Sequence, residues 1–495
     1  MPVVARPWRS PVTPPRSPAG SPLPTRADIV AGRPLVATCL AVRPWSRPRS
    51  RPPVSPLTPA PAGHCLATMP PFVFIFILLV LLSTSSSASP KREVYALWKL
   101  KASVVPSNGS AALADWDPAA ASPVHCSFSG VTCDTGARVV AINITALPLH
   151  GGTLPPELAL LDALANLTIA ACCLGGHVPA SLHALPFLRH LNLSNNNLTG
   201  TLPSGPGPRY FQSLELLDVY NNNLSGPLPP FGPVHAGTLR YLHLGGNYFS
   251  GKIPDDYGDV DQLEYLNLAG NCLSGRVPAS LGRLKRLREM YVGYYNKFDG
   301  GVPPEFGELK ALVVLDMSSC SLTGPIPPEL GRLKQLNKLY LFWNGLSGDI
   351  PPALGELKHL EELDLSCNEL AGKIHASLAN LRKLKLLNLF GNYLHGAIPE
   401  FVAKLPNLEV LQIMDNNLAG HLPAGLGKNG RLKTLDVGDN YLTGLVPPAL
   451  CTGGKLEKLW LMDNSFFGPI PESLGDCKTL RSVQLQNNFL SGPIP

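Results

Sequence analysis

The most regular feature of the chain is a spacing of leucines that recurs every 24 residues. It is clearest from Leu360 to Ile374, where the sequence follows the pattern LxxLxLxxNxLxGxIP. In an extended strand alternate side chains point to opposite faces. Leu363 and Leu365 are therefore predicted to enter a core, while Glu362 and Asp364 face away from it. One such unit cannot bury its leucines alone, so the units are expected to stack on one another.

The asparagine of the pattern ends the strand and marks each repeat. Its amide can satisfy backbone groups that the inward turn leaves unpaired. Cysteine takes the same place at Cys172 and Cys320, and a degenerate first repeat lies at Leu147, which gives fifteen coils. The repeat asparagines are Asn196, Asn222, Asn247, Asn271, Asn296, Asn344, Asn368, Asn392, Asn416, Asn440, Asn464 and Asn488.

The repeat predicts the fold class and its boundaries. Residues 139–495 are expected to form an α/β leucine-rich-repeat solenoid, curved as a horseshoe or superhelix, with about fifteen 24-residue plant-type repeats. Pro-Pro steps such as Pro351-Pro352 are expected to start short helical or irregular convex segments. His375 replaces the expected proline in one coil, and no function is predicted for it.

The two ends of the solenoid differ. Residues 90–138 contain Trp98, Trp116 and a cysteine pair ahead of the coils, and they are expected to form the N-terminal cap that a solenoid needs. The sequence stops at Pro495 within a GPIP turn, and no C-terminal cap is predicted. An uncapped sheet edge is a liability, so we expect a fragment, a truncated paralogue or a wrongly predicted gene.

The segment ahead of the cap has the composition of a leader and a signal. Residues 1–68 are rich in Pro and Arg, and no fold is predicted for them. Residues 69–89 contain eleven apolar residues followed by small ones, as in a secretory signal peptide. The positively charged segment that normally begins a signal peptide is missing after Met69. Eleven residues are too few to span a bilayer. Translation is expected to start at Met69 and the mature chain near Ser89; a transit peptide is the alternative for residues 1–68.

Charge does not point to nucleic acid. The net charge is +6, but residues 1–68 hold nine Arg, no Lys and one Asp. The rest of the chain is therefore at about −2, and no nucleic-acid partner is predicted.

Four cysteines are predicted to form disulfides. Cys126 and Cys133 have a C-x6-C spacing, which in a secreted protein favours a disulfide over a metal site. Cys451 and Cys477 are 26 residues apart, one coil plus two. Both are therefore expected on the convex side of neighbouring coils, where a Cα separation near 6 Å makes a second disulfide feasible.

No metal, cofactor or catalytic site is predicted. Cys172, Cys173 and His177 lack a fourth ligand at zinc spacing. The twelve His are scattered, and the kinase signatures (a Gly-rich loop, VAIK, HRD and DFG) do not occur. Sequons agree with secretion, and their absence from the later coils would leave a binding face free of glycan. They lie at Asn108, Asn143, Asn166, Asn192, Asn197 and Asn223.

Several segments resemble plant leucine-rich-repeat receptor kinases. They are the LSGxIP form of the repeat, the tryptophans before the cysteine pair, YVGYYNKFDGGVPPEFGEL (Tyr291–Leu309) and NGRLKTLDVGDNYLTGLVPPALC (Asn429–Cys451). The resemblance is closest to the CLAVATA and barely-any-meristem group and covers about residues 91–495. It implies an extracellular receptor for a short secreted CLE peptide in meristem and vascular development, with a co-receptor kinase among its partners. The relatives' membrane helix and Ser/Thr kinase have no counterpart in this sequence.

The expected ligand site can also be bounded by geometry. Fifteen coils at about 4.8 Å each give roughly 70 Å of concave sheet, and a dozen extended residues reach at most about 40 Å. From the coil of Asn296 onward, large apolar groups occupy positions that strand alternation puts in solvent, which suggests a groove. These candidate ligand-binding residues are Tyr291, Tyr294, Tyr340, Phe342, Trp343, Phe390, Met414 and Trp460.

Acidic residues accompany the aromatic row. Such carboxylates suit a ligand with basic side chains, although Asp is also a common solvated residue on this face. They are Asp316, Asp364, Asp415, Asp436, Asp439 and Asp463.

One late strand departs from the family pattern. The resemblance implies an RxR pair that reads the free carboxyl terminus of a CLE peptide, and in this sequence that pair falls on Ser482 and Gln484. Arg481 is one residue away, and a shift of one residue in a strand changes the face to which a side chain points. We therefore expect weak binding of a free-carboxylate peptide, or a different or carboxyl-extended ligand.

Two other functions remain open on the sequence. A polygalacturonase-inhibitor type of protein shares the GxIP repeat, but it usually has ten coils and a C-terminal cysteine cap. A secreted decoy that binds the peptide without signalling would look the same over these residues.

Overall fold

Most repeats form a three-residue strand in which one inward residue stands between two outward ones. In β18 (Glu362–Asp364) the inward residue is Leu363, which is fully buried, and so is Leu365, the residue after the strand. Full burial of one leucine side chain stabilises the fold by roughly 1.5–3 kcal/mol, and the repeat multiplies that contribution along the stack. The leucines of successive coils form one continuous core from the cap to the last coil.

The computed structural model describes residues 90–105, 112–117, 124–147, 149, 151–203 and 210–495. The expected leader (1–68), the expected signal peptide (69–89) and the sequon at Asn108 lie outside the described residues. Among the described residues, no helix is both long enough and apolar enough to cross a membrane.

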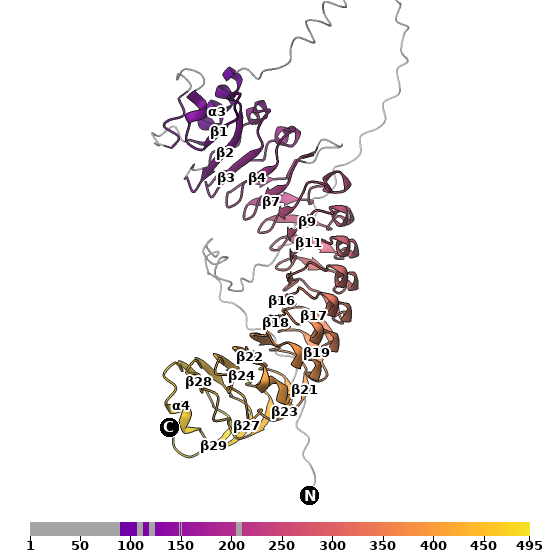
Figure 1. Cartoon of the computed structure of the whole chain (residues 1–495), viewed down its shortest axis with the longest axis vertical. Coiled ribbons are helices and arrows are strands. Elements are labelled where there is room, and N and C mark those ends of the chain that lie inside the picture. Colours follow the sequence, from indigo (N-terminus) through magenta and orange to yellow (C-terminus); the bar gives the residue numbers. More distant parts are fainter. Residues whose placement is uncertain (1–89, 106–111, 118–123, 148, 150, 204–209) are drawn as a thin grey trace, which may run out of the picture. The chain divides into compact units, whose positions relative to one another are not determined.

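The strands of the repeats join into one sixteen-stranded sheet, in which each strand lies beside that of the next coil (Figure 1). Only β1 pairs antiparallel, with β2, and the fifteen strands from β2 onward are parallel, which matches the fifteen predicted coils. The sheet consists of β1 (Val131–Cys133), β2 (Val139–Thr145), β3 (Asn166–Ala170), β4 (His190–Asn192), β6 (Leu216–Asp218), β8 (Tyr241–His243), β10 (Tyr265–Asn267), β12 (Glu289–Tyr291), β14 (Val314–Asp316), β16 (Lys338–Tyr340), β18 (Glu362–Asp364), β20 (Leu386–Asn388), β22 (Val410–Gln412), β24 (Thr434–Asp436), β26 (Lys458–Trp460) and β28 (Ser482–Gln484).

Short second strands follow the repeat asparagines and pair into three smaller parallel sheets. The first contains β5 (Thr199–Gly200), β7 (Asn223–Gly226), β9 (Tyr248–Gly251), β11 (Cys272–Gly275) and β13 (Lys297–Phe298). The other two contain β15 (Thr323–Gly324), β17 (Gly345–Asp349) and β19 (Glu369–Ala371), and then β21 (His395–Gly396), β23 (Asn417–His421), β25 (Tyr441–Gly444), β27 (Ser465–Pro469) and β29 (Phe489–Ser491).

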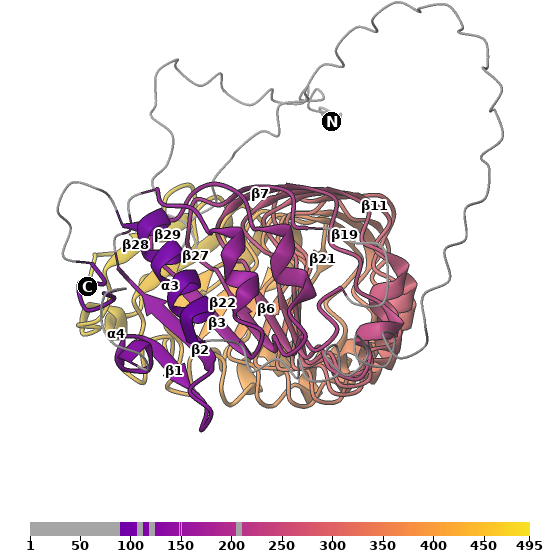
Figure 2. The same cartoon turned by 90° about the horizontal axis from the view of Figure 1, so that it is seen from above.

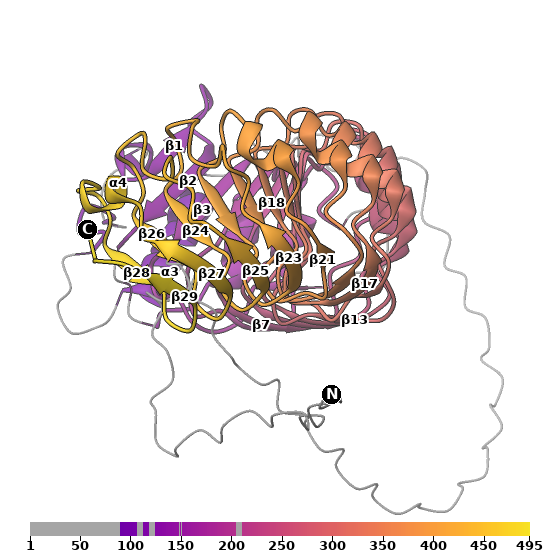
Figure 3. The same cartoon turned by 90° about the horizontal axis from the view of Figure 1, so that it is seen from below.

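Helical turns close the coils on the side away from the main sheet, as Figures 2 and 3 show. Pro352 occupies the first turn of one of them, as predicted, because proline lacks the N–H that a helix start leaves unpaired. His375 has a local role after all, since its Nδ1 accepts a hydrogen bond from the Ser377 N–H at 3.1 Å and caps its turn. The turns are η2 (Pro156–Leu160), η3 (Ala180–Ala184), η4 (Pro233–His235), η5 (Asp255–Asp259), η6 (Ala279–Arg283), η7 (Pro304–Glu308), η8 (Pro328–Arg332), η9 (Pro352–Glu356), η10 (Ala376–Asn380), η11 (Glu400–Lys404) and α4 (Glu472–Gly475).

The repeat asparagines form the predicted ladder. The Asn368 side-chain amide donates to the carbonyl oxygens of Leu341, in the preceding coil, and of Leu365, both at 3.0 Å. Its Oδ1 accepts the Leu346 N–H at 3.1 Å. In the variant coil, the Cys320 thiol donates to the Met317 carbonyl oxygen at 2.9 Å. The Cys172 thiol donates to the Ala170 carbonyl oxygen at 3.1 Å and, in the preceding coil, to that of Ile144 at 3.6 Å.

The cap covers the first end of the core. Helix α3 (Pro90–Val104) buries Leu97 and Leu100 against it, and η1 (Val124–Ser127) and β1 complete the cap. Trp116 is buried and stacks on Phe128, with ring centroids 5.8 Å apart. Trp98, in contrast, is 41% exposed on α3.

Both predicted disulfides are present. Cys126 and Cys133 join η1 to β1 with their Cα atoms 5.5 Å apart. Cys451 and Cys477 join neighbouring coils on the convex side with their Cα atoms 6.0 Å apart.

Candidate functional site

The candidate site is the face of the main sheet opposite the leucine core, called here the concave face. In-register pairing places equivalent residues of successive coils side by side, so that Tyr340 on β16 pairs with Asp316 on β14 and with Asp364 on β18. Because the pairing repeats from coil to coil, each outward position becomes a row that crosses the strands. A ligand lying across the strands would therefore meet one side chain of each row per coil.

Three of the predicted aromatic residues, Tyr294, Tyr340 and Phe342, form one cluster on the concave face, and Tyr291 lies on the strand before it. The rings of Tyr294 and Phe342 meet edge to face with their centroids 6.1 Å apart, and the ring of Tyr340 lies 6.5 Å from that of Phe342. Tyr291 begins the row on β12 and donates from its hydroxyl to Glu289 at 2.8 Å. Tyr294 is 40% exposed and the other three are half-buried. The cluster therefore presents ring edges and hydroxyl groups rather than fully solvated rings.

The insertion in the coil of Asn296 shapes this cluster. Tyr294 and Tyr295 both adopt left-handed backbone conformations, with φ of +53° and +61°. Most coils have a single left-handed residue before the asparagine, so two in succession absorb the extra residue. With this backbone change, the Tyr294 ring contacts the ring of Phe342, which belongs to the second coil further along the chain.

Asp316 does not stand in solvent as strand alternation predicted. It is 7% exposed because its register partners, Tyr291 and Tyr340, flank it on both sides. Its carboxylate accepts the Ser318 N–H at 3.0 Å, and burial raises its pKa. Asp316 therefore supports the turn beneath the aromatic cluster and is not positioned as a direct ligand contact.

Trp343, Phe390 and Met414 continue the face towards the later coils. Trp343 is 53% exposed and has a left-handed backbone, with φ of +55°. Phe390 and Met414 take the position of Phe342, two residues before the repeat asparagine, in the second and third coils further along, and they are half-buried. Asp415 follows Met414 and is exposed, and burial together with the charge of Asp439 raises its pKa.

Trp460 links the last two strands of the sheet. Its indole N–H donates to the Ser482 hydroxyl at 2.9 Å, and the Lys458 ammonium lies 5.7 Å from its ring centroid. Gln484 pairs in register with Trp460. The positions to which the resemblance assigns two arginines therefore hold neutral side chains next to an indole, and Arg481 lies exposed just before the strand.

An aromatic cluster on the earlier coils was not predicted. Tyr241 stacks on Tyr265 with centroids 4.2 Å apart, and His243 stacks on Tyr220 with centroids 4.6 Å apart. Tyr265 and Tyr291 lie 5.8 Å apart, which connects this cluster to the later one. Tyr241 and Tyr265 occupy the first outward position of their strands, in register with Glu289, so the same alternation would have identified them.

His243 is the least solvated polar group of that cluster. Burial lowers its pKa to about 4, so it is neutral at neutral and mildly acidic pH. Its Nδ1 lies 3.6 Å from an Asp218 carboxylate oxygen, and its Nε2 has no hydrogen-bond partner among the described residues.

The asparagines of the sequons that the structure describes differ in how exposed their side chains are. Asn143, Asn197 and Asn223 are exposed, whereas Asn166 and Asn192 are half-buried on concave strands. The Asn192 side chain also accepts the Ser194 N–H at 3.0 Å. Glycosylation of these residues stays a prediction.

Comparisons with known proteins agree with this geometry. The model named leucine rich repeat N-terminal domain matches residues 90–134. The model named leucine rich repeat matches residues 187–208, 213–232, 238–259, 262–284, 311–333, 335–357, 359–381, 431–452 and 455–477.

Solved structures narrow the family. A TDR receptor is 40% identical, with a TM-score of 0.67, and the match covers 71% of this chain and 61% of that chain. The ectodomain of the Arabidopsis receptor kinase HAESA, solved with an extended IDA peptide hormone, is 34% identical, with a TM-score of 0.70. That match covers 82% of this chain and 67% of HAESA's. The chain belongs to the leucine-rich-repeat ectodomain family of plant receptor-like kinases.

This receptor ectodomain aligns with only a small part of its curated relatives. A probable inactive receptor kinase of Arabidopsis thaliana is 34% identical over 82 residues, which are 16% of this chain and 13% of that protein. The predicted leucine-rich-repeat solenoid is confirmed. The narrower CLAVATA and barely-any-meristem group stays a prediction.

Proposed function

We propose that this ectodomain binds a short secreted peptide of the CLE type along its concave face, as the extracellular part of a receptor kinase in meristem or vascular signalling. The observation that carries the proposal is the strip of large side chains from Tyr291 to Trp460 on strands whose leucines are fully buried. A peptide extended across the strands would meet a new coil about every 4.8 Å. HAESA, a relative, has been solved with a peptide hormone.

The conformation of Trp343 supports a binding role for this strip. Its place before the repeat asparagine is left-handed in most coils and is otherwise filled mainly by Gly, Asn, Asp or another small residue. A left-handed backbone costs a bulky residue about 1–2 kcal/mol. Because a large indole in this conformation costs the fold stability, we infer that Trp343 serves as a contact for a ligand and not as a stabilising residue.

A second receptor chain is also part of the proposal. HAESA has been solved in complex with IDA and the co-receptor SERK1. We infer that a co-receptor leucine-rich-repeat kinase joins this ectodomain at the extracellular face of the plasma membrane once the peptide is bound.

Truncation of two aromatics of the strip, the exposed Trp343 and the half-buried Tyr340, tests the peptide site. Trp343→Ala or Tyr340→Ala should each weaken the binding of a synthetic CLE-type dodecapeptide by about 1–3 kcal/mol, since such residues dominate interface energies. The fold should be kept because neither change touches a core leucine. Titration calorimetry against a panel of such peptides measures the effect.

Tyr441→Ala is the matched control. Tyr441 is 67% exposed but lies on β25, outside the main sheet, so its loss should leave affinity unchanged. Equal effects of Trp343→Ala and Tyr441→Ala would reject the concave strip as the site. Failure of the wild type to bind any peptide of the panel would reject the CLE class.

A further inference from the structure

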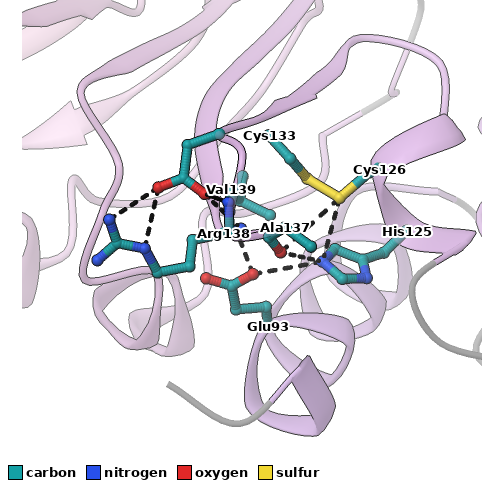
Figure 4. Close-up of a disulfide and its surroundings, with 9 residues drawn as sticks. Glu93, His125, Cys126, Cys133, Ala137, Arg138 and Val139 are labelled. Carbon is teal, nitrogen blue, oxygen red and sulfur yellow. Dashed lines mark hydrogen bonds and ion pairs between the residues drawn. A yellow bond between two sulfur atoms is a disulfide. The ribbon is translucent and has the colours of Figure 1, made fainter. Parts of the chain in front are cut away.

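Helix α3 of the N-terminal cap points its single acid inward and leaves its outer surface basic. Glu93 is the only acid of the helix and is 1% exposed. Its carboxylate lies 3.3 Å from the His125 Nε2 and accepts the Val139 N–H at 3.1 Å, beside the cap disulfide (Figure 4). No carboxylate of the helix is therefore left outside to neutralise its bases. These bases are Lys91, Arg92, Lys99 and Lys101.

Two aromatic side chains share this outer surface. Tyr95 and Trp98 are 44% and 41% exposed, and their ring centroids lie 6.1 Å apart. Residues three apart on a helix are neighbours on one face, so both rings lie on the same side. The Lys99 ammonium lies 5.4 Å from each of the two ring centroids. We call these three residues, together with Lys91 and Arg92, the α3 platform.

The platform is fixed by the packing beneath it. Leu97 and Leu100 are fully buried on the opposite side of the helix. The Lys101 ammonium donates to the Trp116 carbonyl oxygen at 3.0 Å and ties the helix to the rest of the cap. A ligand that binds an anchored surface has little ordering to bring about. A pair of neighbouring exposed rings at such a place indicates a contact surface.

The positive charges of the platform are weakly compensated. Among the described residues, the ion-pair partner of Lys99 is Glu157, at 3.9 Å, which is a long separation for an ion pair. Lys91 and Arg92 are exposed and form no ion pair within the described part of the chain. An anion at this surface would therefore meet three cations whose charge is available to it.

This combination of rings and cations fits an acidic sugar polymer. One face of a pyranose ring carries mainly C–H groups, which pack on the electron-rich face of an aromatic ring. A uronic acid adds a carboxylate to the same sugar, and lysine and arginine bind carboxylates. Lys91 and Trp98 are seven residues apart, about 10 Å along the helix axis, so an oligomer and not a single sugar spans the platform.

An anionic membrane surface fits the platform less well. A helix that binds a membrane surface buries a broad apolar face among the lipids. Of the described side chains of α3, only Tyr95 and Trp98 are large, apolar and exposed. Two rings surrounded by lysine and arginine suit a narrow polar chain better than a bilayer.

We propose that the α3 platform binds an acidic polysaccharide built of uronic acids, of the polygalacturonate type. The rings of Tyr95 and Trp98 contact the apolar faces of successive sugars, and Lys91, Arg92 and Lys99 bind their carboxylates. This site is independent of the proposed peptide site, because it lies on the cap and not on the concave face. The cap would thus contact the extracellular polymer while the concave face stays free for a peptide.

Titration of the full-length chain with an oligogalacturonate tests the proposal. Wild type should bind the oligomer, and tryptophan fluorescence should shift to the blue as Trp98 is covered. Trp98→Ala should weaken binding about tenfold or more, whereas Trp98→Phe should keep most of the affinity and lose the fluorescence shift. Lys91→Ala/Arg92→Ala should weaken binding and make it less sensitive to salt, because fewer charges take part.

Matched variants and ligands separate this site from general charge attraction. Phe187→Ala removes an aromatic ring that is 57% exposed outside the cap, and Lys428→Ala/Arg431→Ala removes two exposed cations of a late coil. Both should bind the oligomer as wild type does. The proposal is overturned if wild type does not bind, if Phe187→Ala loses as much affinity as Trp98→Ala, or if the two basic pairs lose equally. Equal affinity for the fully methyl-esterified oligomer, or preferential binding of phosphatidylserine vesicles, also overturns it.

Discussion

Aspartates on the concave face divide into two kinds according to their place in the coil. Asp316, Asp364 and Asp436 lie at the strand end, and each accepts the N–H of the residue two positions later. Asp415 and Asp463 lie just before the repeat asparagine and are exposed. The first kind holds the turn and the second is available to a ligand. Basic ligand residues are therefore expected to meet the second kind.

Asp436 should make stability depend on pH. Burial raises its pKa to about 6, although the Gly438 N–H and Lys458 oppose the shift. The folded state then holds the proton more tightly than the unfolded chain, so this contribution is full below about pH 4 and is lost as pH rises through about 6. At about 1.4 kcal/mol per pKa unit, Asp436→Asn should be more stable than wild type by on the order of 2–3 kcal/mol at pH 7.

Urea unfolding at pH 4 and pH 7 measures this difference. The two proteins should be equally stable at pH 4, and the exposed Asp463→Asn should match wild type at both values. A stability difference between wild type and Asp436→Asn that is the same at pH 4 and pH 7 would contradict the assignment.

At the scale of the element, the composition of β28 bears on whether the late coils can bind the free carboxyl end of the proposed peptide. Arginine offers a planar fork that matches a carboxylate, whereas Ser482 and Gln484 offer only neutral donors. Trp460 already donates to the Ser482 hydroxyl. We therefore propose that this strand suits a ligand whose carboxyl end is absent, masked or elsewhere.

Restoring the arginines should restore recognition of that end. Ser482→Arg/Gln484→Arg should raise affinity for a free-carboxylate CLE-type peptide tenfold or more, about 1.4 kcal/mol per decade, and leave its carboxyl-amidated form nearly unaffected. Calorimetry with both peptide forms decides between these outcomes. The Ser482→Lys/Gln484→Lys variant is the control, because it adds the same positive charge without the planar guanidinium groups of arginine. Equal gains for both peptide forms would show general charge attraction instead.

At the scale of the molecule, the chain is a stack in which each coil bonds to the next. Its local stability is then set by the interfaces between neighbouring coils along the continuous core. Cys451–Cys477 adds a covalent link between late coils. Closing a loop of that length is worth about 3–4 kcal/mol in the chain-entropy account.

Removal of this disulfide should therefore act locally. Cys451→Ser/Cys477→Ser should increase amide hydrogen exchange in β24, β26 and β28 while β14 to β18 stay protected. Cys173→Ser, which removes a cysteine outside the disulfides, should leave both regions unchanged. Uniform loss of protection along the whole solenoid would show that the coils unfold as one unit.

The sequence by itself determined the repeating part of the protein. The coil number, the inward leucines and the asparagine ladder follow from the 24-residue period, because each coil meets the same neighbours. The two cysteine pairs were predicted from their own spacings. Even so, the pattern could not show that His375 caps a turn, since the bond depends on its side-chain rotamer.

Only the tertiary structure decided which outward residues are accessible. Asp316 is covered because Tyr291 and Tyr340 lie in register beside it, and the three come from different coils. Tyr294 reaches Phe342 because two left-handed residues displace it. Glu93 lies beside His125 because α3 and η1, 32 residues apart at these positions, meet in the cap. Each depends on contacts between distant segments, and those are fixed by stacking and packing rather than by spacing along the chain.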